Sequence, residues 1–209
     1  MSEFFFVKSL EEDFTTKTLK GLKKVNYQIL RSIVIKRVIL PNTKSFGRQR
    51  RLSTTILSPH YLKTYRPHGI IFTTSQKPDY IIPFDLVLLS ETDNIVVHYY
   101  RIKDNLHMYY NHSLLAGFER FIFKDFESMI RRYSAPKDVW KAVNAFRRKH
   151  GYKELSRAKY RLVEYNEAVF HTPVKIEPVA LYGYLPRTRE LGKELGLPVF
   201  RTAKEFFLR

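Results

Sequence analysis

The chain has 209 residues, a formal net charge of +17 and no cysteine. The missing cysteine excludes disulfide bonds, thiolate metal sites and cysteine nucleophiles, and it favours a cytoplasmic protein. No run of about eighteen apolar residues occurs, so we expect no membrane span. Because 44% of the residues are hydrophobic, the chain can form a packed core and is not expected to be disordered.

Positive charge is concentrated in the first part of the chain. Between Asp13 and Asp79 there is no carboxylate, and the 65 residues in between hold 14 Lys and Arg. A field of one sign attracts a polyanion. A nucleic-acid backbone is the expected polyanion, because each neutralised phosphate releases counterions. The alternative is a lysine-rich surface of the thermophile type, although such surfaces usually intersperse Glu with Lys.

The first third of the chain is predicted to form a helix, a strand and a loop. Ser9-Leu10-Glu11-Glu12 is typical of a capping box, and a helix of about 14 residues is expected to follow. The β-branched residues in 29–40 predict a strand that Pro41 and Asn42 end. A loop as long as 42–68 is usually functional or mobile. Its cations are expected to contact phosphates and position a duplex: Lys44, Arg48, Arg50 and Arg51.

A hairpin is predicted near the middle of the chain, after a short strand at 69–74. Two β-rich runs, 84–89 and 95–103, flank five turn-type residues. This hairpin would bring Asp85 and Lys103 to one edge of a sheet. A carboxylate beside a lysine at such an edge is suited to hold Mg²⁺ and to stabilise charge on a phosphodiester.

The rest of the chain is predicted to be helical and then to alternate. Helices are expected over 113–133 and 134–150, the second ended by Gly151, with Trp140 in the core. The tail reads as strand 178–184, helix 186–195, strand 198–200 and a last helix at 203–208. A right-handed crossover would place the two tail strands parallel in one sheet.

With these motifs the chain resembles the PD-(D/E)XK nuclease superfamily, which has the restriction-endonuclease-like fold. The resemblance covers 78–103, with Pro83-Phe84-Asp85 as the first half of the motif and Arg101-Ile102-Lys103 as the second. The tail looks like the closing strand-helix-strand of Mrr-type and Holliday-junction-resolvase-like members. Membership would imply Mg²⁺-dependent hydrolysis of phosphodiester bonds, with DNA favoured over RNA. Resolvase-like relatives also suggest a homodimer.

The resemblance implies an α/β fold with a central mixed β-sheet flanked by helices. Residues 1–68 would form a basic N-terminal region that contacts nucleic acid. Residues 69–209 would form the restriction-endonuclease-like core, with a helical insert at 112–160.

One position departs from the family pattern. The second acidic ligand should stand two residues before the lysine, where this chain has Arg101, and strand alternation puts Arg101 on the same face as Lys103. If the acid has migrated to Glu119, the resemblance implies Asp85 and Glu119 as metal ligands and Lys103 as transition-state stabiliser. If metal chemistry is lost, the cationic face that includes Arg101 binds nucleic acid without cutting it.

Simpler explanations exist for the same residues. Asp85 could cap a strand or bond in a turn, and Glu119 could pair with Arg120 or Lys124 on a solvated helix face. A basic structural or scaffold protein, whose arm meets RNA or an acidic protein, is a third functional class.

Overall fold

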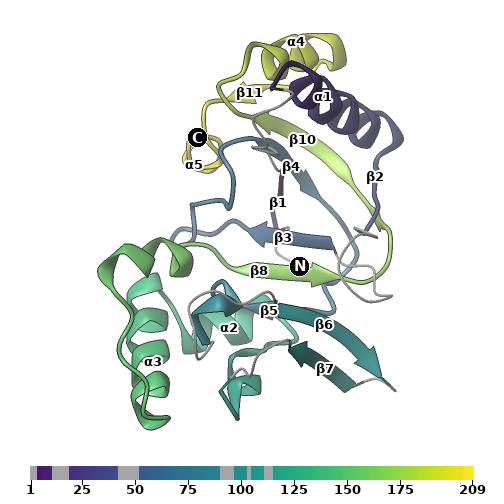
Figure 1. Cartoon of the computed structure of the whole chain (residues 1–209). Coiled ribbons are helices and arrows are strands. Elements are labelled where there is room, and N and C mark those ends of the chain that lie inside the picture. The colour runs from purple at the N-terminus through teal and green to yellow at the C-terminus, as the bar shows by residue number, and fades with distance from the viewer. Residues whose placement is uncertain (1–3, 11–18, 42–51, 90–96, 103–104, 111–114) are drawn as a thin grey trace. The chain divides into compact units, whose positions relative to one another are not determined.

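A computed structural model describes residues 4–10, 19–41, 52–89, 97–102, 105–110 and 115–209. The chain divides into two compact units, which are considered separately below. Unit 1 comprises Met1–Leu40, Thr54–Gln76 and Pro173–Arg209, and unit 2 comprises Pro41–Ser53 and Lys77–Thr172. The elements, labelled in Figure 1, make the chain an α/β protein with a mixed β-sheet and flanking helices, as predicted at that level.

Unit 1 contains the mixed part of the sheet, with strands in the order β11-β10-β4-β1-β3. The strands are β1 (Phe6–Ser9), β3 (Leu52–Ile56), β4 (Gly69–Thr73), β10 (Glu177–Tyr182) and β11 (Val199–Phe200). β1 pairs antiparallel with β3 and β4, and β10 pairs antiparallel with β4. Only the last three residues of β3 belong to unit 1.

The tail of unit 1 confirms the predicted crossover. β10 and β11 are parallel, and α4 (Pro186–Leu195) joins them. Pro186 at the first turn and Gly196 at the C-cap, with φ of 65°, bound this helix. Glycine tolerates that left-handed conformation without a Cβ penalty, so the stop signal was readable in the sequence. The last helix, α5 (Ala203–Phe207), packs Phe206 against Phe5 and Phe200.

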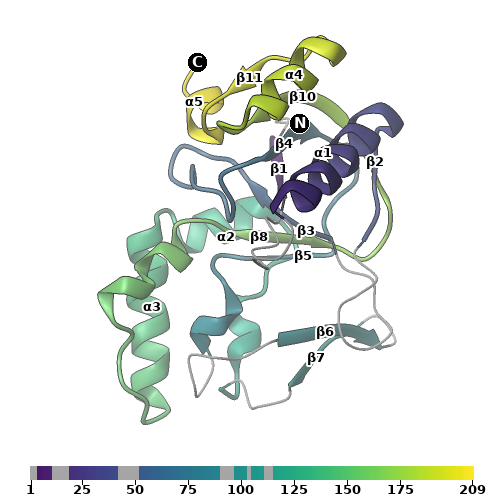
Figure 2. The same cartoon turned by 45° about the horizontal axis from the view of Figure 1, so that its top comes forward.

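The predicted strand at 29–40 is wrong, because α1 (Leu19–Lys36) continues to Lys36 and only β2 (Val38–Ile39) is extended. Leu30 and Val34 are buried one helical turn apart, whereas Ile29 and Ile35 are exposed. Burial at i and i+4 therefore outweighs the β-propensity of the branched side chains. β2 pairs with β9 (Val174–Lys175). Figure 2 shows α1 and α4 side by side, where Arg31 and Glu194 form an ion pair of 2.7 Å.

Two further predictions for the N-terminal region are wrong. Ser9 does not cap a helix, because it lies in β1, where its hydroxyl shares a 3.0 Å hydrogen bond with the hydroxyl of buried Tyr182. Part of the predicted loop at 42–68 is extended, since β3 occupies 52–56 and most of its residues are buried. The polar and basic residues around this strand made its short apolar pattern hard to recognise.

Unit 2 combines short strands with helices. β5 (Tyr80–Ile82) pairs antiparallel with β8 (Glu167–Phe170), and β6 (Val97–Ile102) with β7 (Asn105–Tyr110). The helical elements are the 3₁₀ segments η1 (Leu86–Leu89), η2 (Phe118–Phe121) and η3 (Arg157–Val163) and the α-helices α2 (Phe126–Arg132) and α3 (Pro136–Lys149).

The predicted hairpin of 84–89 with 95–103 is wrong. Its first run forms η1, and its second run pairs with β7, so that Arg101 lies opposite Leu106. Leu88 and Leu89 are fully buried. A short apolar run that is buried all round does not distinguish a strand from a helical turn by its periodicity.

The helix predictions for unit 2 are confirmed in part. α3 lies within the predicted 134–150. The predicted helix at 113–133 is instead η2, which ends at Phe121, followed by α2, which Asp125 caps. Its carboxylate accepts a 2.7 Å hydrogen bond from the Ser128 amide. That bond lowers the pKa of Asp125, since it stabilises the ionised carboxyl.

Candidate nucleic-acid interface

Several of the predicted site residues lie outside the described residues. These are Lys103 and the loop cations Lys44, Arg48, Arg50 and Arg51. For Arg101 the structure describes the backbone, which belongs to β6. The predicted hairpin was expected to bring Lys103 close to Asp85. β6 pairs with β7 instead of with the segment that holds Asp85. The predicted roles of these residues remain hypotheses.

Asp85 and Glu119 occupy different surroundings in unit 2. Asp85 is half-buried just before η1, and its carboxylate accepts a 3.0 Å hydrogen bond from the Tyr165 hydroxyl. Its amide donates to the carbonyl oxygen of Leu162 at 3.0 Å. Glu119 is exposed in the first turn of η2. Among the described residues, no group of three or more His, Asp or Glu side chains is arranged to hold a metal ion. The predicted roles of Asp85 and Glu119 as metal ligands therefore stay predictions.

A second basic segment lies in unit 2 and is described in full. Residues 131–161 hold eleven Lys and Arg but only two carboxylates, Asp138 and Glu154, which is a local net charge of +9. Asp138 accepts hydrogen bonds from the Ser134 hydroxyl and the Ala135 amide at the start of α3, and Glu154 forms an ion pair with Arg148. Both acids are therefore already engaged by neighbouring groups.

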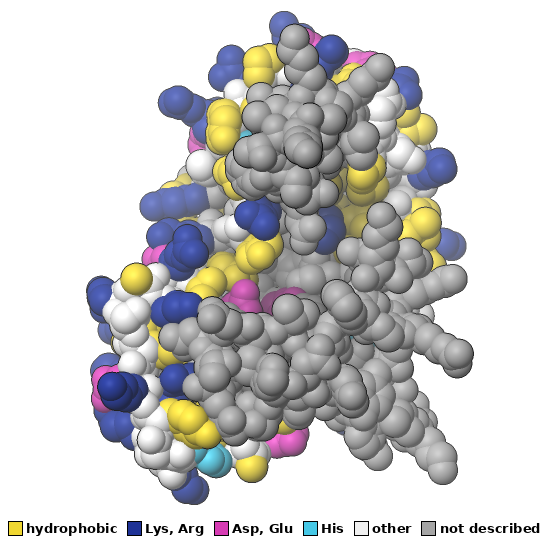
Figure 3. All heavy atoms as spheres, in the orientation of Figure 1, with side chains coloured by type: hydrophobic (Ala, Val, Ile, Leu, Met, Phe, Trp, Pro, Cys, Tyr) yellow, Lys and Arg dark blue, Asp and Glu magenta, His cyan; other side chains and the backbone are white. Residues whose placement is uncertain are grey.

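Helical spacing places part of this charge on one face of α3. Lys137, Lys141 and Arg148 follow one another at four and seven residues, so they share the exposed side of the helix. Val139, Val143 and Phe146 form the buried side. Lys and Arg side chains gather over the α3 side of unit 2 in Figure 3, at the lower left, with hydrophobic side chains among them. The helix thus presents a cationic row to solvent.

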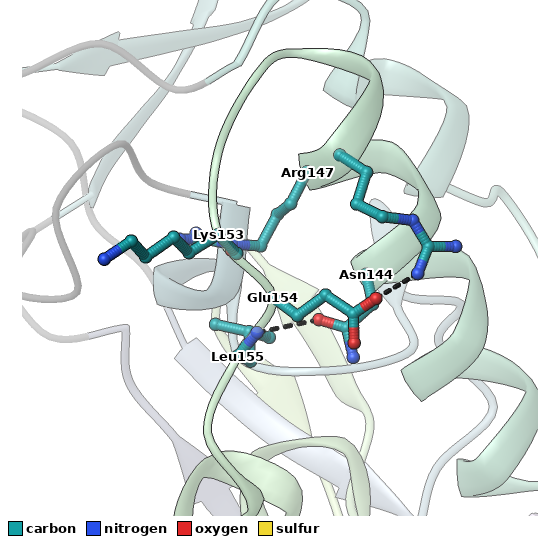
Figure 4. A network of polar contacts seen from close by, with 6 residues as sticks. Asn144, Arg147, Lys153, Glu154 and Leu155 are labelled. Carbon is teal, nitrogen blue, oxygen red and sulfur yellow. Dashed lines mark hydrogen bonds and ion pairs between the residues drawn. The ribbon is translucent and has the colours of Figure 1, made fainter.

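The segment after α3 is held by buried polar groups of that helix (Figure 4). Arg147 is 5% exposed, and it donates to the carbonyl oxygens of Lys153 at 3.0 Å and Leu88 at 3.2 Å. Asn144 is also buried and accepts a 2.9 Å hydrogen bond from the Leu155 amide. A buried polar side chain is costly unless it is hydrogen-bonded, so these bonds fix residues 153–155 against α3. They also fix the start of η3, which packs on the same helix.

An aromatic pair lies where η3 meets α3. Trp140 and Tyr160 are both half-buried, and their ring centroids are 5.4 Å apart at an interplanar angle of 62°. The Arg157 guanidinium lies 4.5 Å from the centroid of the Tyr160 ring. The expectation that Trp140 lies in the core is therefore wrong in part. Its helix is amphipathic, but Trp140 lies at the border between the buried side and the cationic row.

We call this region the α3–η3 surface. It comprises the aromatic pair and the exposed cations of α3, η3 and the connecting segment: Lys137, Lys141, Arg148, Lys149, Lys153, Arg157 and Arg161. An absence of carboxylates does not single out this region in the sequence, because Asp138 and Glu154 interrupt it. A count of net charge in a sliding window would have found 131–161, since only two acids interrupt it.

Cations of the N-terminal region that the structure describes are partly engaged within unit 1. Arg31 pairs with Glu194, and Arg37 pairs with Glu177 at 3.0 Å. The hydrogen bond from Arg31, and then that from the Tyr27 hydroxyl, lowers the pKa of the Glu194 carboxyl. These contacts hold α1 to α4 and residue 37 to β10, so they serve the fold.

Comparison with protein-family models, with curated proteins and with solved structures found no match. Within the described ranges, no helix combines the length and the apolar character needed to cross a membrane. The function must therefore be inferred from the chemistry of the chain itself.

Proposed function

We propose that this protein binds nucleic acid through the α3–η3 surface of unit 2. The observation that carries the proposal is the local net charge of +9 on a fully described segment whose two carboxylates are already engaged. A concentrated field of one sign raises the association rate and the affinity for a polyanion. Release of counterions from the phosphates would supply most of the binding free energy.

The chemistry of the surface favours contacts to the backbone. Lys and Arg side chains on an exposed helix face reach phosphate oxygens, and such contacts position a nucleic acid without reading its sequence. The row Lys137–Lys141–Arg148 rises by about 16 Å along α3, at about 1.5 Å per residue. We therefore expect several phosphates to be contacted at once, and little dependence on sequence.

A direct binding experiment tests this function. Fluorescently labelled DNA and RNA oligonucleotides are titrated with the full chain at about 100 mM salt, and anisotropy is followed as salt is raised. We expect tight binding that weakens steeply with salt. No affinity for either nucleic acid at that salt concentration would leave only the structural or scaffold class.

Cleavage of DNA at Asp85, Lys103 and Glu119 stays a separate proposal. The resemblance to the PD-(D/E)XK superfamily supports this proposal. The hydrogen bond that Asp85 accepts from the Tyr165 hydroxyl does not add support, because it also fits a structural role of Asp85. The test is incubation of plasmid and branched DNA with the protein and Mg²⁺. Nicking that Asp85→Ala abolishes, without a loss of DNA affinity, would establish cleavage. Intact DNA with every divalent ion, under conditions that saturate binding, would overturn it.

A further inference from the structure

The two aromatic residues of the α3–η3 surface, Trp140 and Tyr160, lie outside the buried core of unit 2. Unit 2 has a buried aromatic core in which Phe121, Tyr133 and Phe146 are 1%, 5% and 5% exposed. Trp140 and Tyr160 are not part of that core, and both residues are only half-buried. They stand beside the row of exposed cations on α3.

We propose that the α3–η3 surface stacks unpaired bases, so that the ligand is single-stranded nucleic acid rather than a duplex. The proposal rests on the proposed function and names its substrate class. In a duplex the faces of the bases are covered by their neighbours, whereas a single strand can place each base on a ring or a guanidinium plane. A surface that needed only phosphates would gain nothing from half-buried aromatic residues beside its cations.

Arg157 supplies the second plane. Its guanidinium lies 4.5 Å from the centroid of the Tyr160 ring, and the residue is exposed. A planar guanidinium over a ring can present its outer face to a base, and it keeps its charge for a phosphate. Trp140 lies 5.4 Å from the same Tyr160 ring, and we call the two rings and the guanidinium the platform.

The charges around the platform fit a strand that follows it. Lys137 and Lys141 lie within one turn of Trp140 on α3. Lys159 and Arg161 flank Tyr160 on η3. A base on the platform would therefore have cations on both sides for its own phosphates. Cations that follow the backbone, combined with aromatic side chains that stack bases, are the general mode of single-strand binding.

The simplest rival explanation is that the two rings only pack η3 onto α3. Trp140 makes the two explanations separable, because it is the single tryptophan of the chain and its fluorescence reports on its own surroundings. Stacking of a base on or beside the indole quenches this fluorescence. A polyanion without bases binds the cations and leaves the indole emission unchanged.

The experiment uses three probes at equal phosphate concentration: an oligodeoxythymidylate of about twelve nucleotides, a duplex of the same length, and inorganic polyphosphate. We expect the single strand to quench Trp140 and to bind at least about fivefold more tightly than the duplex, as stacking of one base would require. Polyphosphate should compete for binding without quenching.

Two variants keep the inference falsifiable. Tyr160→Leu removes a ring and should abolish the preference for the single strand, but it also touches the packing of η3. Arg157→Lys keeps the charge and replaces an exposed residue, so the fold is not at risk. We expect it to weaken binding of the single strand more than binding of the duplex or of polyphosphate.

The outcomes separate the two proposals. Equal affinity for single strand, duplex and polyphosphate, with no quenching that depends on bases, overturns the stacking inference and leaves nucleic-acid binding standing. Binding of none of the three overturns both. A preference for the single strand that Arg157→Lys and Tyr160→Leu both leave intact also overturns the inference, because the preference then arises elsewhere in the chain.

Discussion

Replacing Lys137 and Lys141 together by alanine should weaken nucleic-acid binding by a calculable amount. Both side chains are exposed on α3, and no acid of the segment faces them, since Asp138 is turned to the helix start. Alanine has the highest helix propensity, so the change should not destabilise α3. The variant therefore removes charge and preserves the surface beneath it.

The magnitude follows from counterion release. The logarithm of the binding constant falls with the logarithm of the salt concentration by about 0.7 for each phosphate that a single strand contacts. When the salt concentration is lowered from about 1 M to about 0.1 M, each phosphate contact therefore raises the binding constant about fivefold. If each lysine contacts one phosphate, the double variant should bind about 25-fold more weakly at 0.1 M salt, with a slope that is smaller by about 1.4.

The assay is anisotropy of a labelled single strand between about 50 and 400 mM salt. Lys193→Ala with Lys204→Ala is the matched control, because both lysines are exposed on helices of unit 1 and the net charge changes by the same two units. The control should lose far less affinity and keep its slope. Equal losses of affinity in the two variants would show that only the total charge of the protein matters. That result would contradict the assignment of the α3–η3 surface as the interface.

Four further outcomes are expected. Gly69→Ala should lower the free energy of unfolding in a urea titration by about 3 kcal/mol or more, because its Cβ would lie 2.1 Å from a backbone carbonyl oxygen of β1. Arg147→Met should cost about 3 kcal/mol in the same assay, since two carbonyl oxygens lose a buried charged donor. Glu194→Gln should reduce the loss of folding stability on acidification below about pH 4. The pKa of Glu194 is lower in the folded protein than in the unfolded chain. Its stabilising contribution is therefore present above the pKa of the unfolded chain and is lost as pH falls through the pKa of the folded protein. Glu154→Gln should tighten single-strand binding and steepen the salt slope by about 0.7, because it releases Arg148 from its ion pair; an unchanged slope would place Arg148 outside the interface.

Some elements could be predicted because their signals are local. α3 has a proline at its start, a regular apolar stripe and a cluster of cations in its last turn. The β10–α4–β11 unit is bounded by Pro186 and by Gly196 in the left-handed conformation. Each of these signals acts within a few residues, so tertiary contacts do not overrule it.

Other elements depended on contacts that the sequence does not display. Ile33, Val34 and Ile35 favour a strand by propensity, yet burial of Leu30 and Val34 on one stripe makes that segment helical. η1 is apolar throughout, so neither its composition nor its periodicity distinguishes a helical turn from a strand. The candidate catalytic pair depended on that assignment, so one wrong element removed the geometric reason for placing Lys103 near Asp85.

The location of the binding surface follows from what holds each unit together. In unit 1, three described arginines are engaged by carboxylates: Arg31 with Glu194, Arg37 with Glu177, and Arg187 with Glu190. In unit 2, α3 is instead held by a buried guanidinium and a buried amide that bond to the backbone, and its cap uses a single carboxylate. Bonds to backbone groups stabilise a fold without neutralising its surface. A polyanion therefore meets cations in 131–161 that have few carboxylates to displace, and this is why we place the interface on the α3–η3 surface.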